Sequence, residues 1–276
     1  MKEEKVYFES QGQKIDGILH LPRRRTDSLI ILVHGFTGTR NGPGGLFLKL
    51  ARKLCERNFA VLRFNFRSTT EDFSQLHKMT IKGEVSDLKL IVDRMSERFN
   101  KIGLAAESLG GLVSVLAYSE KVKCLVLWYP VIFQGETELG RRFLSKKAEK
   151  ELRRAGFIKE RTSNGKEYKV GKRFVEELRT LNAVPYLKKI RSPTCIIHGE
   201  KDNVVSCSHS ERLLKILRCP KKLEIFLESS HAFKNEDFVD YNFVAQEKAI
   251  KLTASWFTKW LRPAVVSKTL YTGSDK

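Results

Sequence analysis

The sequence has no pairing pattern among its cysteines and no hydrophobic run long enough to cross a membrane. Its five cysteines are an odd number and include no Cys-x-x-Cys pair, so neither a disulfide framework nor a zinc site is predicted. No apolar stretch approaches the ~20 residues that a transmembrane helix needs. The first five residues, which include Lys and Glu, do not resemble a signal peptide. We therefore expect a cytoplasmic protein with no metal ion and no membrane partner.

Acidic residues are few relative to basic ones. The chain has 51 Lys and Arg residues against 32 Asp and Glu residues, which gives a formal net charge of +19. Such a charge could attract nucleic acid. However, the basic residues are spread among acids on the expected helices, and no recognised nucleic-acid-binding motif accompanies them. We therefore expect a solvated basic surface without a nucleic-acid partner, and the sequence leaves a homodimer open.

The sequence does contain a regular alternation of strand and helix patterns. Two alternating segments around Gln11-Gly12 predict an amino-terminal antiparallel hairpin. From residue 29 onward, strands and helices follow one another as in βα units, which predicts a mostly parallel, twisted sheet with helices on both faces. The expected strands are 29–33, 60–66, 102–106, 124–128, 193–197 and 223–227, and the expected helices are 46–57, 81–99, 109–118, 208–217 and 243–260.

The alternation is interrupted between Ile132 and Val184. This stretch is too long for one crossover, and it is polar, with fourteen Lys or Arg and eight Glu residues between positions 136 and 182. We interpret it as an inserted helical cap with helices at 144–155 and 172–181 around a turn at 163–165. The expected organisation is a core of residues 1–132 and 185–262, a cap of residues 133–184 and a flexible tail of residues 263–276.

Ser108 lies where an expected strand turns directly into an expected helix. The segment Ala106-Glu-Ser-Leu-Gly110 is similar to a nucleophile elbow, in which the serine adopts strained backbone angles and the residues two positions away must be small. Ala106 and Gly110 meet this requirement, although the usual first residue is Gly. A serine near a glycine is more often only part of a turn, so the interpretation needs support from elsewhere in the chain.

Two further polar residues follow the ends of later strands. Asp202 comes after the strand 193–197, and His231 comes after the strand 223–227. A serine becomes a nucleophile when a histidine removes its proton and an acid orients that histidine. The order Ser, Asp, His is the one used by α/β-hydrolases. Glu200 is a rival for the acid, and we prefer the shorter carboxylate of Asp202, just before Val204.

Taken together, these motifs resemble the α/β-hydrolase superfamily, and within it the small cytoplasmic esterases that include cinnamoyl and feruloyl esterases, with serine-aminopeptidase-like hydrolases nearby. The resemblance covers nearly the whole chain. Besides the elbow, it rests on residues 34–38, 59–67, 83–87 and 198–205. It implies the α/β-hydrolase fold, no cofactor, the nucleophile Ser108, the acid Asp202 and the base His231. It also implies that the backbone N–H groups of Phe36 and Leu109 form the oxyanion hole.

From these residues we expect a serine hydrolase that cleaves carboxylic esters with small to medium or aromatic acyl groups through an acyl-enzyme. Trp128, Tyr129 and Phe133, near the end of an expected strand, and Phe174 of the cap are expected to line the acyl pocket. Triad chemistry does not choose between an ester oxygen, a sulfur and an amide nitrogen, so a peptidase or a thioesterase is the alternative. A non-catalytic binding scaffold is a more remote alternative.

Overall fold

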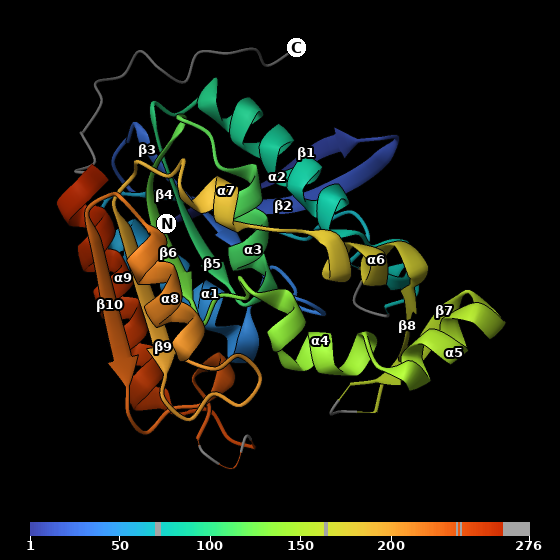
Figure 1. The fold of residues 1–276 in the computed structure, drawn as a ribbon. Helices are drawn as coiled ribbons and strands as arrows, with labels where there is room; N and C mark the ends of the chain where they lie inside the picture. The colour runs from blue at the N-terminus through green and yellow to red at the C-terminus, as the bar shows by residue number, and fades with distance from the viewer. Residues whose placement is uncertain (70–72, 163–164, 236, 238, 262–276) are drawn as a thin grey trace.

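An eight-stranded sheet forms the centre of the protein in the computed structural model, which describes residues 1–69, 73–162, 165–235, 237 and 239–261 (Figure 1). The spatial order is β1-β2-β4-β3-β5-β6-β9-β10; β2 pairs antiparallel with β1 and with β4, and the other neighbours are parallel. The predicted hairpin and mostly parallel sheet are confirmed. The strands are β1 (Lys2–Ser10), β2 (Gln13–Leu21), β3 (Ser28–Val33), β4 (Ala60–Phe64), β5 (Lys101–Glu107), β6 (Val122–Trp128), β9 (Thr194–Gly199) and β10 (Lys221–Phe226).

The central strands are apolar throughout because both faces of the sheet are covered. All six residues of β3 are buried. Leu29, Ile31 and Val33 belong to one hydrophobic cluster, and Ile30 and Leu32 belong to another on the opposite face. A continuous hydrophobic run of this kind is typical of parallel strands that lie between two helical layers.

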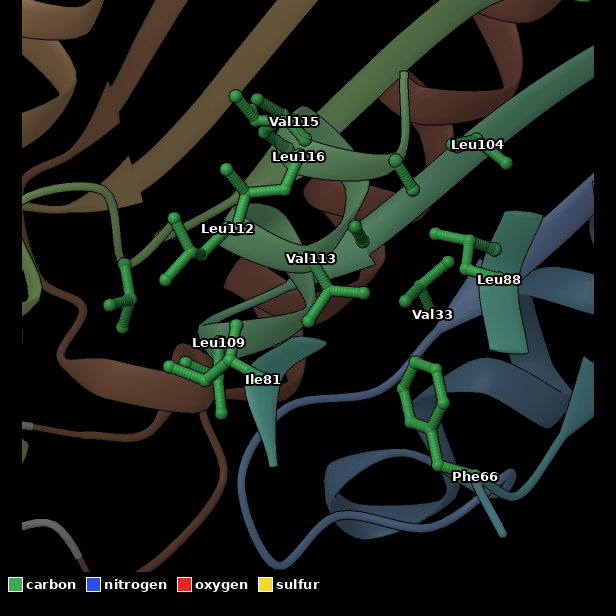
Figure 2. Close-up of a cluster of buried hydrophobic side chains, with 14 of the residues drawn as sticks. Val33, Phe66, Ile81, Leu88, Leu104, Leu109, Leu112, Val113, Val115 and Leu116 are labelled. Carbon is green, nitrogen blue, oxygen red and sulfur yellow. The ribbon is translucent and has the colours of Figure 1, made fainter. Parts of the chain in front are cut away.

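Helices cover both faces of the sheet, as predicted (Figure 1). The helices α1 (Leu46–Glu56) and α9 (Phe243–Leu261) contribute to one cluster, and α2 (Ile81–Ser96), α3 (Leu109–Ala117) and α8 (Ser208–Ile216) contribute to the other. Figure 2 shows side chains of α3 packing with residues from α2, β3 and β5. This burial of apolar surface fixes α3, and with it the turn that precedes the helix, against the sheet.

The stretch between β6 and β9 leaves the sheet. The predicted cap helix at 144–155 corresponds to Lys146–Ala155, and a further helix at Glu138–Phe143 was not predicted. The two helices are separate because Thr137 and Ser145 each cap one of them by accepting a backbone N–H with the side chain. Figure 1 shows α5, β7 and β8 on the side of the molecule opposite β10. The elements are η3 (Gln134–Glu136), α4 (Glu138–Phe143), α5 (Lys146–Ala155), β7 (Phe157–Arg161), β8 (Glu167–Gly171), α6 (Lys172–Thr180) and α7 (Val184–Leu187).

Besides η3, three short 3-10 helices lie in loops of the described chain: η1 (Pro43–Gly45), η2 (Leu76–Lys78) and η4 (His231–Phe233). Positions 163 and 164 of the predicted cap turn and the predicted tail, residues 263–276, lie outside the described residues. Within the described part of the chain, no helix combines the length and the apolar character needed to span a membrane.

The strand order places one crevice at the carboxyl edge of the sheet. From β3 the chain moves to β4 on one side and then returns to β5 on the other side of β3. Such a reversal separates the loops that follow the two strands, and ligands of open α/β sheets bind there. The loops after β3, β5, β6, β9 and β10 all begin at this edge because these strands are parallel.

Candidate active site

Ser108 joins β5 to α3 in a strained conformation. Its φ of 49° and ψ of −121° are unusual for a residue with a side chain. Hydrogen bonds hold this conformation: the Ser108 N–H donates to Trp128 O at 3.0 Å, and the Ser108 carbonyl accepts from Gly111 at 3.0 Å and Val131 at 2.9 Å. The serine is partly exposed between two buried neighbours. Backbone strain held in place in this way is typical of a functional site.

The loop after β3 lies directly against this turn. A Cβ atom on Gly110 would lie 2.5 Å from Val33 O and 2.6 Å from His34 O, and a Cβ atom on Gly35 would lie 2.9 Å from the Ser108 Cβ. A real Cβ atom does not approach another non-bonded heavy atom this closely. The small residue expected two positions after Ser108 is therefore required by the approach of the β3 loop.

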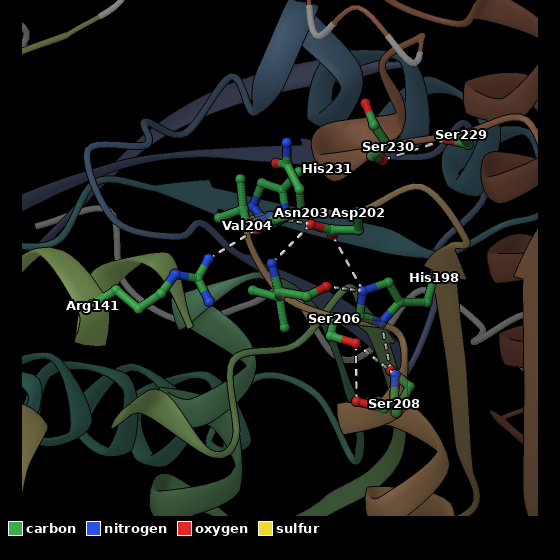
Figure 3. Close-up of polar contacts among 12 residues, drawn as sticks. Arg141, His198, Asp202, Asn203, Val204, Ser206, Ser208, Ser229, Ser230 and His231 are labelled. Carbon is green, nitrogen blue, oxygen red and sulfur yellow. Dashed lines mark hydrogen bonds and ion pairs between the residues drawn. The ribbon is translucent and has the colours of Figure 1, made fainter. Parts of the chain in front are cut away.

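His231 and Asp202 are hydrogen-bonded to each other. The His231 Nδ1–H donates to Asp202 Oδ2 at 2.7 Å (Figure 3). The other carboxylate oxygen accepts the backbone N–H groups of Val204 at 2.9 Å and Val205 at 2.8 Å. Glu200, the rival acid, is exposed. With the proton held on Nδ1 by the carboxylate, Nε2 of His231 is the nitrogen that can accept a proton.

Burial and charge act in opposite directions on these two residues. Burial would raise the pKa of Asp202, but the charge of His231 and hydrogen bonds from His198 and His231 hold this pKa well below its usual range. Burial would lower the pKa of His231, but the charge and the hydrogen bond of Asp202 raise it above its usual value. The carboxylate therefore stays ionised at neutral pH and stabilises the protonated imidazole.

A second histidine, to which the sequence analysis assigned no role, contacts the same carboxylate. His198 Nε2 lies 3.2 Å from Asp202 Oδ2 (Figure 3). The same nitrogen lies 2.8 Å from Val205 O, and His198 Nδ1 lies 2.6 Å from Ser210 Oγ. Two oxygen acceptors face Nε2, so Nε2–H is the donor and Nδ1 accepts the hydroxyl proton of Ser210. The only sequence signal for this contact is a histidine at the end of the otherwise apolar strand β9.

Ser108 and His231 line the same cleft, which has a volume of about 570 Å³. Gly35 and Phe36 from the β3 loop line it as well, and the cap contributes Lys166. The volume suits a small organic molecule. The remaining lining residues are Thr37, Gly38, Thr39, Asn41, Gly42, Pro43, Gly44, Phe73, Glu107, Thr162, Ala232 and Tyr241.

The two residues expected to donate to an oxyanion lie beside Ser108. The side chain of Leu109 belongs to the core (Figure 2), so that only its backbone faces the turn. The Leu109 nitrogen would lie 3.4 Å from a Cβ atom on Gly35, which immediately precedes Phe36. The N–H of Leu109 is also at the N-terminus of α3, where the helix dipole favours an anion. Oxyanion binding by Phe36 and Leu109 stays a prediction.

Trp128 and Tyr129 do not line the cleft, contrary to the expected acyl pocket. Trp128 is fully buried under α9, where its Nε1–H donates to Thr253 Oγ1 at 3.0 Å. Tyr129 is also fully buried; its hydroxyl donates to Glu107 Oε2 at 2.9 Å, and its ring centre lies 4.6 Å from that of His231. Tyr129 therefore contacts the histidine rather than the open cleft.

Phe133 and Phe174 also differ from the expectation. Phe133 lies under the Arg212 guanidinium, 3.6 Å from ring centre to charge centre, and lines a different surface hollow. Phe174 is buried and stacks on Phe36 with a centroid distance of 5.2 Å. The sequence analysis assigned a role only to the backbone N–H of Phe36. In the structure, Phe36 also forms part of the cleft wall, and Phe174 of the cap packs against its ring.

Across the described ranges, no group of three or more His, Cys, Asp or Glu side chains is arranged to hold a metal ion. What the site does contain is a hydroxyl, an imidazole and a carboxylate, which together suit acyl transfer.

Comparison with known proteins agrees with this geometry. The model of the dienelactone hydrolase family matches residues 179–261. No curated protein matches the chain. Among solved structures, the α/β-hydrolase GrgF from Penicillium sp. sh18 is similar, with a TM-score of 0.75, 14% identity, and coverage of 95% of this chain and 100% of that one.

Two further solved structures are similar over a comparable extent. Est1E from Butyrivibrio proteoclasticus, solved with ferulic acid bound, has a TM-score of 0.73 and 20% identity, with coverage of 92% of this chain and 99% of that one. Dienelactone hydrolase from Anabaena variabilis has a TM-score of 0.65 and 19% identity, with coverage of 94% and 98%. The chain therefore has the α/β-hydrolase fold, and the matched family and neighbours support a hydrolase.

Proposed function

We propose that this protein is a serine esterase that cleaves carboxylic esters through an acyl-enzyme, with Ser108 as nucleophile, His231 as general base and Asp202 as the acid that orients it. One observation carries the proposal. A strained, partly exposed serine shares a cleft with a histidine whose Nδ1–H donates to a buried carboxylate at 2.7 Å. This arrangement activates a hydroxyl group at neutral pH.

In the first half of the reaction, Ser108 Oγ attacks the ester carbonyl carbon and its proton moves to Nε2 of His231. The C–O bond to the alcohol then breaks, and the alcohol leaves with that proton. In the second half, water attacks the acyl-enzyme carbonyl and gives a proton to Nε2, which returns it to Ser108 as the carboxylic acid departs. Asp202 keeps its negative charge throughout, since its pKa is held far below neutral pH.

The tetrahedral intermediates carry a negative oxygen, which the N–H groups of Phe36 and Leu109 are proposed to bind. The N-terminus of α3 adds a favourable dipole at the same position. Loss of one such donor typically costs about 3 kcal/mol of transition-state stabilisation. A donor of this kind thus contributes more than most single pocket contacts.

The cleft favours small to medium acyl groups, aromatic acids included. Phe36, Phe73 and Tyr241 present aromatic side chains to the space around Ser108. Flat aromatic surfaces of this kind bind aromatic rings. The similar Est1E structure holds ferulic acid, an aromatic acid, which supports the same class of acyl group here.

Hydrolysis of short and medium p-nitrophenyl esters by the wild type and by Ser108→Ala tests the mechanism. We expect the wild type to release p-nitrophenol with a burst of one equivalent if deacylation is slow, and the variant to lose activity. Ser96→Ala is the control, because Ser96 is the half-buried last residue of α2 and does not line the cleft. Residual activity in Ser108→Ala would show that Ser108 is not the nucleophile.

A panel of matched ester, thioester and aminoacyl-arylamide substrates tests the choice of leaving group. We expect the highest kcat/KM for the esters. A clear preference for the thioester or the arylamide would instead indicate a thioesterase or a peptidase that uses the same residues. No turnover of any substrate, together with no reaction of Ser108 with a fluorophosphonate, would indicate a binding scaffold.

A further inference from the structure

Glu107 is a buried carboxyl group at the centre of the site that the proposed mechanism does not use. It immediately precedes Ser108, it is 6% exposed, and it lines the cleft. Its Oε1 accepts the backbone N–H of Gly35 at 3.3 Å, and its Oε2 accepts the hydroxyl proton of Tyr129 at 2.9 Å. One side chain thus connects the loop after β3, the end of β5 and the end of β6.

Each partner of Glu107 is next to a group that the mechanism uses. Gly35 immediately precedes Phe36, so a hydrogen bond to the Gly35 N–H fixes the chain that presents the Phe36 N–H. The ring of Tyr129 lies 4.6 Å, centre to centre, from the imidazole of His231. One oxygen of the carboxyl group is therefore bonded to the loop after β3 that carries Phe36, which we call the oxyanion loop. The other oxygen is bonded to Tyr129, the residue whose ring packs against His231.

The backbone of Tyr129 has a strained conformation that its surroundings must maintain. Its φ is 37°, which is costly for a residue with a large side chain. Its N–H donates to Ile197 O at 2.8 Å. The hydroxyl stays protonated, since burial and the nearby Glu107 raise the pKa of Tyr129 well above its usual value. Tyr129 is thus a permanent donor to the carboxyl group, in a conformation that only its surroundings maintain.

We propose that Glu107 is a positioning residue: its carboxyl group holds the oxyanion loop through Gly35 and the support of His231 through Tyr129, so that both are aligned with Ser108. This inference rests on the proposed serine esterase function and adds to it. A displacement of about 1 Å in a catalytic group can cost about 100-fold in rate. A carboxyl group with two directional hydrogen bonds prevents such a displacement on both sides of the nucleophile.

Burial raises the pKa of Glu107, whereas the hydrogen bonds from Tyr129 and Gly35 and the charge of His231 act to lower it. In its ionised form, Glu107 also acts on the base through its charge. A carboxylate near an imidazole favours the protonated ring, and Glu107 is one of the groups that raise the pKa of His231. A purely structural contact would not change this equilibrium. The titratable or charged groups around Glu107 and His231 are Tyr129, Glu138, Lys166, Asp202 and Tyr241.

Three variants separate alignment from charge. Glu107→Leu removes both hydrogen bonds and the charge. Glu107→Gln removes the charge but can keep both bonds, because its amide oxygen accepts from Gly35 and its amide nitrogen can donate to the Tyr129 oxygen. Tyr129→Phe removes one bond and keeps the ring. Tyr118→Phe is the matched control, since Tyr118 follows the C-terminal end of α3, opposite the end that Ser108 precedes, and its hydroxyl bonds with Ser192 Oγ at 2.9 Å.

The measurements are kcat and KM for a p-nitrophenyl ester across pH, the thermal midpoint, and the rate at which a fluorophosphonate labels Ser108. We expect Glu107→Leu to lower kcat about 100-fold with little change in KM. We expect Glu107→Gln to recover most of kcat while the acid limb of kcat/KM moves to lower pH, because the imidazolium loses a nearby negative charge. The kcat of Tyr129→Phe should lie between those of the wild type and Glu107→Leu, and Tyr118→Phe should keep the wild-type kcat.

Wild-type kcat in Glu107→Leu would overturn the proposal. So would a Glu107→Gln protein that loses as much kcat as Glu107→Leu while its acid limb stays unchanged. If Glu107→Leu does not fold, Tyr129→Phe decides, and an unchanged kcat there counts against the proposal. If the wild type cleaves no ester, the proposed function fails, but the fluorophosphonate rates still report alignment: equal labelling of all folded variants then overturns the positioning role.

Discussion

Asp202 accepts the Nδ1 proton of His231 through one carboxylate oxygen, while its other oxygen accepts two backbone N–H groups. This division predicts the effect of Asp202→Asn. The amide oxygen would remain with the two backbone donors, and the amide NH2 would face His231. His231 would then have to accept at Nδ1 and carry its proton on Nε2, where it cannot take the proton of Ser108. We expect kcat to fall about 10⁴-fold with a folded protein.

Glu200→Gln is the matched control for that variant. Glu200 is the other acid on the same loop, and its side chain is exposed, so we expect wild-type kcat. Steady-state kinetics on one p-nitrophenyl ester compare the two variants directly. Substantial activity in Asp202→Asn, or its loss in Glu200→Gln, would show that the acid was assigned to the wrong residue.

The pKa of His231 sets the pH at which the enzyme becomes active. The base must be neutral to take the serine proton, so kcat/KM should rise as pH passes through this pKa. Burial lowers the pKa of His231, but Asp202, with smaller contributions from Glu107 and Glu138, raises it above its usual value. We therefore expect the midpoint of the acid limb to lie above the ordinary imidazole value of about 6.5. A pH profile of kcat/KM for an ester without titrating groups measures it. A midpoint below 6.5 would mean that burial outweighs the carboxylate.

The positions of Ser108, Asp202 and His231 could be predicted from the sequence for a simple physical reason. Each lies on the loop after a strand of the sheet, and the carboxyl ends of parallel strands meet at one edge of the sheet. Residues far apart in the chain therefore converge there without any knowledge of side-chain contacts. The same argument predicts which loops form the cleft, and the β3 loop indeed lines it.

Trp128 lies in the core rather than at the cleft because nearness to the end of a strand does not decide which face a side chain takes. In β6, Cys124, Val126 and Trp128 alternate onto one face and pack beneath α9. Applying this period of two would have placed Trp128 in the core. The conformation of Tyr129 could not be predicted, since its positive φ depends on hydrogen bonds and packing from other segments.

Gly110 is required by the carbonyl groups of the β3 loop, and its replacement should disrupt the site. In Gly110→Ala the added Cβ atom would lie 2.5 Å from Val33 O, so that α3 or the loop would have to move. We expect a loss of several kcal/mol of stability or failure to fold. Gly135→Ala is the control, because its Cβ atom would meet nothing within 4 Å. Thermal unfolding of both variants tests the prediction, and an equally stable Gly110→Ala protein would contradict it.

Phe36 and Phe133 offer a matched pair of substitutions for acyl preference. Phe36 lines the cleft beside Ser108, whereas Phe133 lies in another hollow under Arg212. We expect Phe36→Ala to change the relative kcat/KM of acetyl, butyryl and aromatic acyl esters by about tenfold, the scale of one hydrophobic contact. We expect Phe133→Ala to leave this ratio as in the wild type. If Phe133→Ala changes the ratio and Phe36→Ala does not, the acyl group binds in the hollow lined by Phe133 rather than in the cleft.

His198 contacts the same carboxylate oxygen of Asp202 that orients His231. Replacing His198 should therefore shift the pKa of His231, in the direction opposite to that expected for Glu107→Gln. In His198→Leu, Asp202 Oδ2 would keep His231 as its side-chain donor and lose the bond from Nε2–H of His198. The carboxylate charge would then act more fully on His231 and raise its pKa further.

We therefore expect the acid limb of kcat/KM in His198→Leu to move to higher pH. The free energy of unfolding should fall by about 1–3 kcal/mol, since Val205 O also loses its buried donor. Ser210→Ala provides a graded comparison, because it keeps the His198 ring but removes the hydroxyl at 2.6 Å from Nδ1 that orients it. Its shift should have the same sign and a smaller size. An acid limb that moves to lower pH in either variant would show that His198 does not compete with His231 for the carboxylate.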